Sequence, residues 1–259
     1  MEQSILHSKI IGTGEKHLLV FHGLFGQLDN WNTHGRQFGE IYTTHLIDLR
    51  NHGRSFHSDD STITAMVEDV NRYMEFHQIN QAHILGHSLG GRVVMDFAIT
   101  YPTKVDHLIV ADMAPKAYQP HHNAIFKALC SVDFETVTSR KDVEETLSLY
   151  IPEAGVRQFL LKNVYHAENG GYDFRFNLPV LQKHYEDLVG NDLLNGVFDG
   201  PTLFLKGAKS NYILQEDEFI IKQRFPKAEI VAIANAGHWL HAENPKDFIE
   251  AIMNFLENK

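Results

Sequence analysis

The sequence predicts an α/β fold, a mostly parallel β-sheet flanked by helices, with an inserted helical lid. Three observations favour this fold. Short apolar runs alternate with longer segments of helical periodicity along most of the 259 residues. One long polar stretch of helical periodicity interrupts that alternation. A serine flanked by glycines, Ser88, stands between an expected strand and an expected helix.

The apolar runs predict six core strands, at residues 17–21, 42–47, 82–85, 107–111, 202–205 and 230–233. The intervening segments predict helices at residues 31–38, 63–77, 89–100, 217–225 and 245–256. The last helix follows Asn244-Pro245, a capping residue and then a proline, which suits the first helical position. This order is typical of a sheet with helices on its faces.

The interruption covers residues 115–190, which contain amphipathic patterns at 142–149 and 178–188 but no convincing central strand. A connection of this length is too long to be a simple loop between two strands. We therefore expect a core at 1–114 and 191–259, with 115–190 forming a lid over one end of the sheet. A separate helical domain without a catalytic role is the alternative.

Composition restricts the classes of partner. The formal net charge of −10 disfavours binding to nucleic acid or to an anionic membrane. No apolar segment resembles a signal peptide or a membrane span, so the default location is cytoplasmic. The chain predicts a monomer or a homodimer, without choosing between them.

Neither a disulfide nor a metal site is expected. The single cysteine, Cys130, lies in an apolar stretch and is predicted to be a small buried side chain. The 17 histidines are mostly scattered, and neither His121-His122 nor the pair His238 and His241 is joined by further ligands at suitable spacing. We therefore expect no metal.

Ser88 is the candidate nucleophile. Gly86-His87-Ser88-Leu89-Gly90 matches G-x-S-x-G between an expected strand and an expected helix. Such a turn exposes the serine hydroxyl, and its glycines leave room for close packing of strand and helix. The start of the helix supplies a backbone donor and the positive end of its dipole.

A serine hydroxyl needs a base, and the base an orienting acid. His238 follows the last expected strand, so it is predicted at the same edge of the sheet as Ser88. Asp112 ends the strand at 107–111 and is the preferred acid, whereas Asp217 is the alternative. The order Ser, Asp, His along the chain suits this arrangement.

An oxyanion hole requires two backbone donors beside the nucleophile. The N–H of Leu89 is one candidate, and that of Leu24, in the glycine-containing loop after the first expected strand, is the other. Neighbouring candidate substrate contacts are His22, Gly23, Phe25, His87 and Trp239. Asp48 and Arg50 are instead predicted to have a structural role in a buried loop with a turn at Gly53.

These motifs together resemble the α/β-hydrolase superfamily across nearly the whole chain. They are His22-Gly-x-x-Gly26, Asp48-x-Arg50-x-His52-Gly53-x-Ser55, Gly86-His-Ser88-x-Gly90-Gly91 and Gly237-His238. Four further segments resemble the YbfF-type bacterial carboxylesterases: Gly26-Gln-Leu-Asp-Asn30-Trp31, Ala111-Asp112-Met-Ala-Pro115, Phe174-Arg175-Phe-Asn177 and His238-Trp-Leu-His241-Ala-Glu243.

That resemblance implies hydrolysis of short-chain esters, or of acyl-CoA thioesters, without a cofactor. It also implies a triad acid after the sixth strand of the family fold, which matches Asp112, with Ser210 standing where many relatives have an acid. Arg175 and Asn177 match family positions in the lid, where they either contact substrate or anchor the lid.

The leading hypothesis is therefore a serine carboxylesterase acting on a small-molecule ester or thioester. A C–C bond hydrolase would use the same residues. Dehalogenases and epoxide hydrolases of this fold need an aspartate at position 88 and are disfavoured. The alternative from another class is a small-molecule receptor with little turnover.

Overall fold

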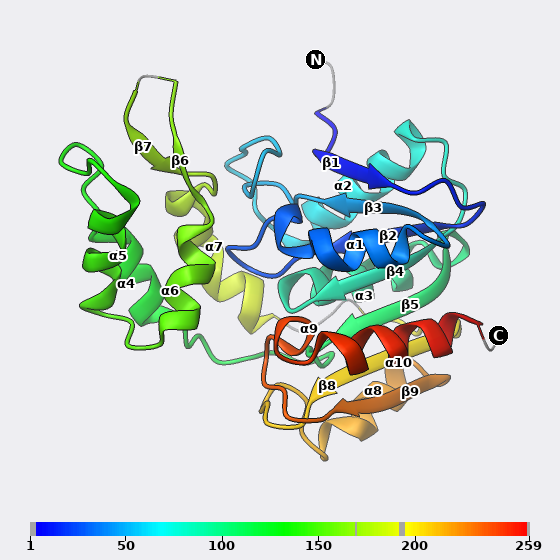
Figure 1. Ribbon diagram of the computed structural model, residues 1–259. Coiled ribbons are helices and arrows are strands. Elements are labelled where there is room, and N and C mark those ends of the chain that lie inside the picture. The colour runs from blue at the N-terminus through cyan, green and yellow to red at the C-terminus, as the bar shows by residue number, and fades with distance from the viewer. Residues whose placement is uncertain (1–3, 169, 192–194, 258–259) are drawn as a thin grey trace.

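The computed structural model describes residues 4–168, 170–191 and 195–257, and its centre is a seven-stranded sheet (Figure 1). The strand order is β1-β3-β2-β4-β5-β8-β9. The bounds are β1 (Ser8–Ile11), β2 (His17–Phe21), β3 (Thr43–Ile47), β4 (Ala82–His87), β5 (Val105–Ala111), β8 (Thr202–Gly207) and β9 (Ala228–Ile233). Only β1 is antiparallel to its neighbour in this sheet, so the carboxyl ends of the other strands meet at one edge.

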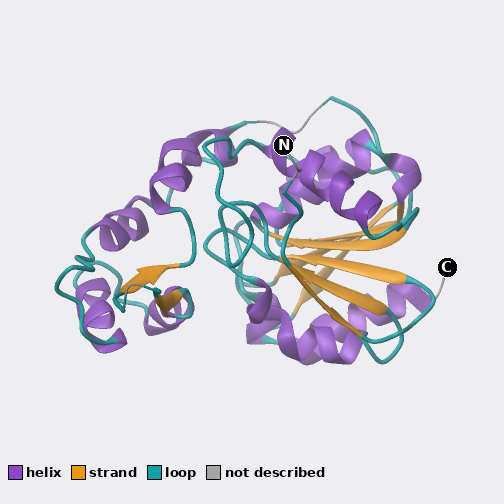
Figure 2. Cartoon of the chain, turned by 90° about the horizontal axis from the view of Figure 1, so that it is seen from above, coloured by secondary structure: helices purple, strands orange, loops and turns teal. Residues whose placement is uncertain are grey.

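Helices cover both faces of the sheet (Figure 2). They are α1 (Asn32–Phe38), α2 (Ile63–Phe76), α3 (Leu89–Thr100), α8 (Asp217–Arg224), α9 (Leu240–Glu243) and α10 (Pro245–Glu257), with a short 3-10 helix at Leu28–Trp31. Alternate residues of β2 enter two different buried clusters. Leu18 and Val20 share one cluster with Phe248 of α10, whereas Leu19 and Phe21 share the other with residues of α2 and α3. The predicted parallel α/β class is thus confirmed.

Side-chain caps fix where two of the predicted helices begin. The hydroxyl of Thr62 accepts a hydrogen bond from the Ala65 N–H at 3.2 Å, at the start of α2. At the start of α10, Asn244 Oδ1 accepts one from the Asp247 N–H at 3.3 Å, with Pro245 as the first helical residue. Such caps satisfy amide groups that have no partner inside the helix.

The predicted helical insertion lies between β5 and β8. It contains α4 (Asn123–Cys130), α5 (Arg140–Ser148), α6 (Ala154–Leu161), α7 (Leu178–Gly190) and a hairpin of β6 (Val164–His166) with β7 (Tyr172–Phe174). These elements lie together at the left of Figure 1, beyond the edge where the parallel strands end. The inserted helical region is therefore confirmed, and the small hairpin within it is an addition to the prediction.

The loop after β2 anchors this insertion to the core. Asn163 Nδ2 donates to the carbonyl of Phe25 at 2.8 Å, and Gln27 Nε2 donates to the carbonyl of Lys162 at 2.9 Å. The ring of Phe25 also packs against that of Phe126, with centroids 5.1 Å apart. The insertion is consequently fixed directly beside the segment that follows the first central strand.

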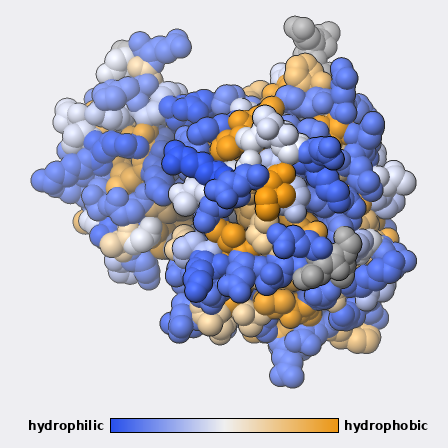
Figure 3. Space-filling view, turned by 45° about the vertical axis from the view of Figure 1, so that its right-hand side comes forward, coloured by the Kyte–Doolittle hydropathy of each residue, from blue (hydrophilic) through white to orange (hydrophobic). Residues whose placement is uncertain are grey.

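The prediction that Cys130 is buried is wrong. The thiol of Cys130 is exposed rather than buried, because Phe126, Ala128 and Leu129 form the buried side of α4. On the face drawn in Figure 3, hydrophilic residues predominate and hydrophobic ones form patches among them. No helix within the described ranges has the length and apolar character needed to cross a membrane.

Candidate active site

Ser88 occupies a sharp turn between β4 and α3. Its backbone has φ of +53° and ψ of −116°, a conformation that residues with a side chain rarely adopt. The turn is held by a hydrogen bond from the Ser88 N–H to the Ala111 carbonyl, at 3.1 Å. A Cβ on Gly86 would lie 2.3 Å from the Gly90 carbonyl oxygen, and one on Gly90 would lie 2.6 Å from that of His22. Glycines at these positions therefore allow the strand, turn and helix to pack.

Ser88, His238 and Asp112 form a continuous chain of hydrogen bonds. Ser88 Oγ lies 3.0 Å from His238 Nε2, and His238 Nδ1 lies 2.8 Å from Asp112 Oδ2. Ser88 follows β4, Asp112 follows β5, and His238 lies in the loop between β9 and α9. The structure thus brings together the three residues that the sequence selected, with Nδ1 donating to the carboxylate and Nε2 accepting from the hydroxyl.

Two further donors hold the carboxylate of Asp112, which is fully buried. Its Oδ1 accepts from the Gly207 N–H at 3.0 Å, and its Oδ2 accepts from the hydroxyl of Ser210. Ser210 therefore supports the acid from the loop in which the sequence offered none. The alternative acid, Asp217, instead pairs with Lys116 at 2.6 Å.

Three groups hold the imidazole of His238 and its backbone. The ring of Tyr212 is stacked on that of His238, with a centroid distance of 3.7 Å and an interplanar angle of 13°. His87 Nε2 donates to the His238 carbonyl at 2.8 Å, and Glu243 Oε2 accepts from the Gly237 N–H at the same distance. Sequence reasoning gave Tyr212 and Glu243 no role, because neither spacing nor residue type pointed to one.

The loop after β2 fixes the direction of the Leu24 amide. His22 Nδ1 donates to the Gly23 carbonyl at 2.8 Å, and the Gly26 N–H donates to the same oxygen at 2.9 Å. In a trans peptide the N–H points opposite to the C=O, so the Leu24 N–H points away from both donors. A Cβ on Gly23 would lie 3.0 Å from Ser88 Cβ, which places this peptide directly against the nucleophile turn.

The second candidate donor is the N–H of Leu89, the first residue of α3. The first amides of a helix have no acceptor within that helix, and they lie at the positive end of its dipole. Leu24 and Leu89 line one cavity together with Ser88, so their amides remain the two candidate donors for a developing oxyanion.

Burial keeps the surrounding histidines neutral. It lowers the pKa of His22 to about 4 and that of His241 to about 3, and it holds the pKa of His87 well below its ordinary value. A neutral His22 is also what its hydrogen bonds require, since Nε2 accepts from the Leu49 N–H at 3.1 Å while Nδ1 donates. These rings add no positive charge beside His238 near pH 7.

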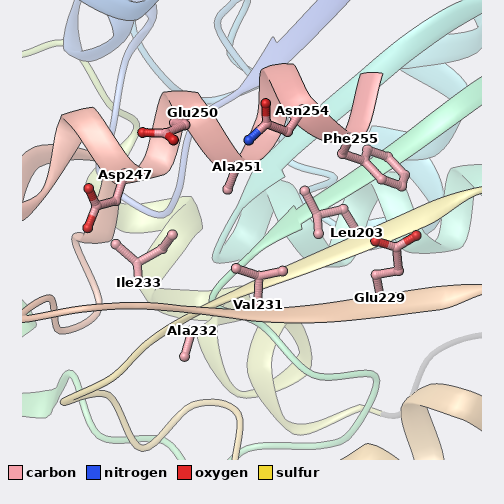
Figure 4. Close-up of a pocket in the computed structure, with 10 residues that line it drawn as sticks. All are labelled: Leu203, Glu229, Val231, Ala232, Ile233, Asp247, Glu250, Ala251, Asn254 and Phe255. Atoms are coloured by element: carbon pink, nitrogen blue, oxygen red, sulfur yellow. The ribbon is translucent and has the colours of Figure 1, made fainter. Parts of the chain in front are cut away.

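Two small cavities adjoin Ser88. One, of about 50 Å³, is lined by the core residues expected to contact substrate and by lid side chains; its lining includes His22, Gly23, Leu24, Phe25, His87, Trp239, Ile125, Val156 and Phe159. The other, of about 20 Å³, is mostly apolar and includes Leu89, Met113, Tyr118, Leu188 and Tyr212. A larger hollow of about 440 Å³ between β9 and α10 contains none of the Ser88 group (Figure 4).

Arg175 and Asn177 are not brought to this site. Arg175 lines neither cavity, and its guanidinium lies over the ring of Tyr165, 4.5 Å from the centroid. Asn177 Nδ2 donates to Asn51 Oδ1 at 3.2 Å, and the Asn177 N–H donates to the Asn51 carbonyl at 2.9 Å. These contacts favour anchoring of the lid over contact with substrate, the two roles that the sequence left open for these residues.

The segment around Asp48 and Arg50 has the structural role that was predicted. Asp48 accepts from the amides of Leu28 and Arg54, at 2.6 and 2.9 Å. Arg50 pairs with the buried carboxylate of Asp69, with Nε 2.5 Å from Oδ2. These interactions organise the loop behind the site.

Several known proteins are similar to this chain in sequence or in structure. A family model of the α/β hydrolase fold matches residues 16–129. The sn-1-specific diacylglycerol lipase ABHD11 of Danio rerio is 38% identical over 257 residues, which cover 95% of this chain and 80% of that protein. Esterase YbfF of Escherichia coli (strain K12) is 34% identical over 242 residues, 93% of each chain. The solved structure of a marine microorganism esterase has a TM-score of 0.95 at 38% identity, covering 98% of this chain and 100% of that one.

The chain therefore belongs to the α/β-hydrolase family, as the motifs had indicated. Within that family it is a hydrolase of the esterase and lipase type, acting on carboxylic ester bonds.

Proposed function

We propose that the protein hydrolyses short-chain acyl esters through an acyl-enzyme formed on Ser88. The observation that carries this proposal is the pair of hydrogen bonds from Ser88 Oγ to His238 Nε2, at 3.0 Å, and from His238 Nδ1 to Asp112 Oδ2, at 2.8 Å. A base oriented by a buried carboxylate raises the nucleophilicity of a serine hydroxyl.

The reaction has two halves. Ser88 Oγ attacks the acyl carbonyl while its proton passes to His238 Nε2, and the N–H groups of Leu24 and Leu89 bind the oxyanion. The alkoxide leaves with the proton from His238, which gives the acyl-enzyme. A water molecule then gives a proton to His238 as it attacks the acyl carbonyl, and His238 returns that proton to Ser88 Oγ as the serine departs, which releases the carboxylic acid.

Residues 115–190 act as a lid in this proposal, over a core formed by 1–114 and 191–259. Support comes from the lid side chains Ile125, Val156 and Phe159, which line the cavity at Ser88. Apolar side chains over the reacting atoms exclude water and strengthen the electrostatic interactions beneath them.

The size of the cavities supports short substrates. Their volumes are about 50 and 20 Å³, whereas one water molecule needs roughly 10–15 Å³ by the same kind of measure. We assign the acyl group to these cavities, so the acyl side of the scissile bond accommodates only a few carbon atoms, and the alcohol group extends outside them. Acyl-CoA thioesters use the same chemistry, provided that the coenzyme extends outside.

Steady-state hydrolysis of a graded panel tests this function. The panel contains p-nitrophenyl acetate, butyrate, octanoate and laurate, together with butyryl-CoA and a long-chain diacylglycerol. We expect many turnovers per enzyme with the two shortest esters, a steep decline already with octanoate, and loss of turnover in Ser88→Ala. Ser148→Ala, which changes an exposed lid serine, is the matched control and retains full activity.

Three results contradict the proposal. Turnover that persists in Ser88→Ala would show that Ser88 is not the nucleophile. A single slow turnover with every substrate favours the small-molecule receptor. Faster hydrolysis of laurate or diacylglycerol than of butyrate overturns the short-chain assignment and favours a lipase.

A further inference from the structure

A second cluster of reactive side chains lies at the other end of the sheet from Ser88. His83 is near the start of β4, and Asp106 and His107 are near the start of β5. Among the described residues, these three are the one group of three or more His, Cys, Asp or Glu side chains whose ligand atoms all lie within 4.8 Å of one another. The separation from Ser88 along β4 is roughly 16 Å, at about 3.3 Å per residue.

A β-bulge brings the three side chains together. Ala82 pairs with Val105, but Ile84 pairs with Leu108, so β5 contains one more residue than β4 between these two pairs. In a regular strand Asp106 and His107 would point to opposite faces of the sheet. The extra residue changes the direction of the strand. As a result, the side chains of Asp106 and His107 both lie close to that of His83.

The carboxylate of Asp106 stands between the two imidazoles. Its Oδ2 lies 3.5 Å from His83 Nδ1, and its Oδ1 lies 3.4 Å from His107 Nδ1. Ligand atoms in a tetrahedral site are about 3.4 Å apart when each lies about 2.1 Å from the metal. The two imidazoles therefore each lie at about this spacing from one oxygen of the carboxylate, and the three ligand atoms lie within 4.8 Å of one another, so small side-chain rotations would complete the coordination sphere.

The imidazole of His83 is buried without a hydrogen-bond partner among the described residues. It is 1% exposed, and neither of its ring nitrogens makes a hydrogen bond to another described residue. Leaving a buried polar group without a partner costs about 1–3 kcal/mol. The side chain of Asp106 is 31% exposed, which leaves a route from solvent.

We propose that His83, Asp106 and His107 bind a divalent transition metal of the zinc class, with solvent as the fourth ligand. Two imidazoles and one carboxylate are a donor set suited to this class of ion. The ion would join the starts of β4 and β5 and would give a partner to one of the two ring nitrogens of His83, which is a stabilising role away from the ester chemistry. The sequence predicted no metal, because the bulge that gathers these ligands leaves no signature in residue spacing.

Replacing Lys16 tests this proposal, because the proposal predicts whether the affinity for metal rises or falls. Its Nζ lies 3.4 Å from Asp106 Oδ2, and its side chain is 60% exposed. A positive charge at that distance disfavours a second cation on the same carboxylate. Removing the lysine should therefore strengthen metal binding, which a merely structural ion pair would not predict.

Isothermal titration of the full chain with ZnCl₂ tests the proposal, with circular dichroism and esterase activity confirming that each variant is folded. We expect one zinc per chain, binding at least tenfold weaker in Asp106→Asn and several-fold tighter in Lys16→Ala. Asp199→Asn, which alters another exposed aspartate paired with a lysine, should bind as the wild type does. Zinc should also raise the Tm of the wild type and not that of Asp106→Asn.

Identical titrations for the wild type and Asp106→Asn would overturn the proposal, since zinc would then be bound only by other histidines. Weaker binding in Lys16→Ala, or a loss in Asp199→Asn equal to that in Asp106→Asn, would overturn it as well.

Discussion

The ring of Tyr212 lies nearly parallel to that of His238, at a centroid distance of 3.7 Å. The phenol is held in turn, since its hydroxyl lies 2.6 Å from His121 Nε2. The face of the imidazole is thus fixed by Tyr212, while its edge is fixed by Asp112. We expect this stacking to keep His238 Nε2 directed at Ser88.

Replacing Tyr212 tests this positioning role. A stacked aromatic pair contributes about 0.5–1.5 kcal/mol, so Tyr212→Ala should lower kcat by up to about tenfold with a smaller change in KM. Tyr212→Phe keeps the stacked ring and should stay within about twofold of the wild type by the same reasoning. Equal losses of kcat in the two variants would assign the effect to the hydroxyl instead.

The two aspartates considered for the triad should respond differently. Asp112→Asn removes the carboxylate that orients His238 and should lower kcat on the order of 10⁴-fold, the scale seen in serine proteases. Asp217→Asn breaks only the ion pair with Lys116 and should leave kcat nearly unchanged. Steady-state kinetics with p-nitrophenyl butyrate measures both, and a severe loss in Asp217→Asn alone would reverse the assignment.

Two glycine substitutions, one in the oxyanion loop and one on the lid surface, should have different effects on kcat. In Gly23→Ala the new methyl group would lie 3.0 Å from Ser88 Cβ and from His87 Nδ1, so the Leu24 amide must shift. We expect kcat to fall by about ten- to a hundredfold, part of what a complete oxyanion donor contributes. Gly155→Ala, at an open position in α6, should keep its activity and gain roughly 0.5–1 kcal/mol in stability. Unchanged kcat in Gly23→Ala would argue against this loop as the second donor.

Stability should decrease as the pH is lowered from about 6.5 to 4. Burial depresses the pKa of several histidines: His22 and His83 to about 4, and His45, His52, His122 and His241 to about 3. In this range the unfolded chain binds protons that the folded chain does not, so each group removes up to about 1.4 kcal/mol per pH unit. Calorimetry should show a falling Tm, and a Tm that is constant between pH 7 and pH 5 would contradict this account.

The core of the fold was predictable because each of its strands can be recognised from a short segment of the sequence. Each central strand is a short apolar run, and Ser88, Asp112 and His238 each stand in a segment that follows such a strand. Strands that lack this signal were missed. β1 is a short edge strand with two exposed residues, and β6 and β7 have three residues each.

The support of the site was less predictable because it depends on contacts between distant segments. Ser210 and Tyr212 reach Asp112 and His238 through the conformation of one loop. His22 was expected to contact substrate, yet its ring nitrogens hold the Gly23 carbonyl and the Leu49 amide. Such roles follow from ring orientation, which residue spacing does not encode.

Labelling with a fluorophosphonate tests most directly whether Ser88 is the nucleophile activated by His238. Peptide mass spectrometry should locate one adduct per chain on Ser88, with loss of esterase activity in proportion to labelling. His238→Ala should slow that labelling by several orders of magnitude, in line with the loss of a triad base. An adduct on another residue, or full esterase activity in the labelled protein, would contradict the account.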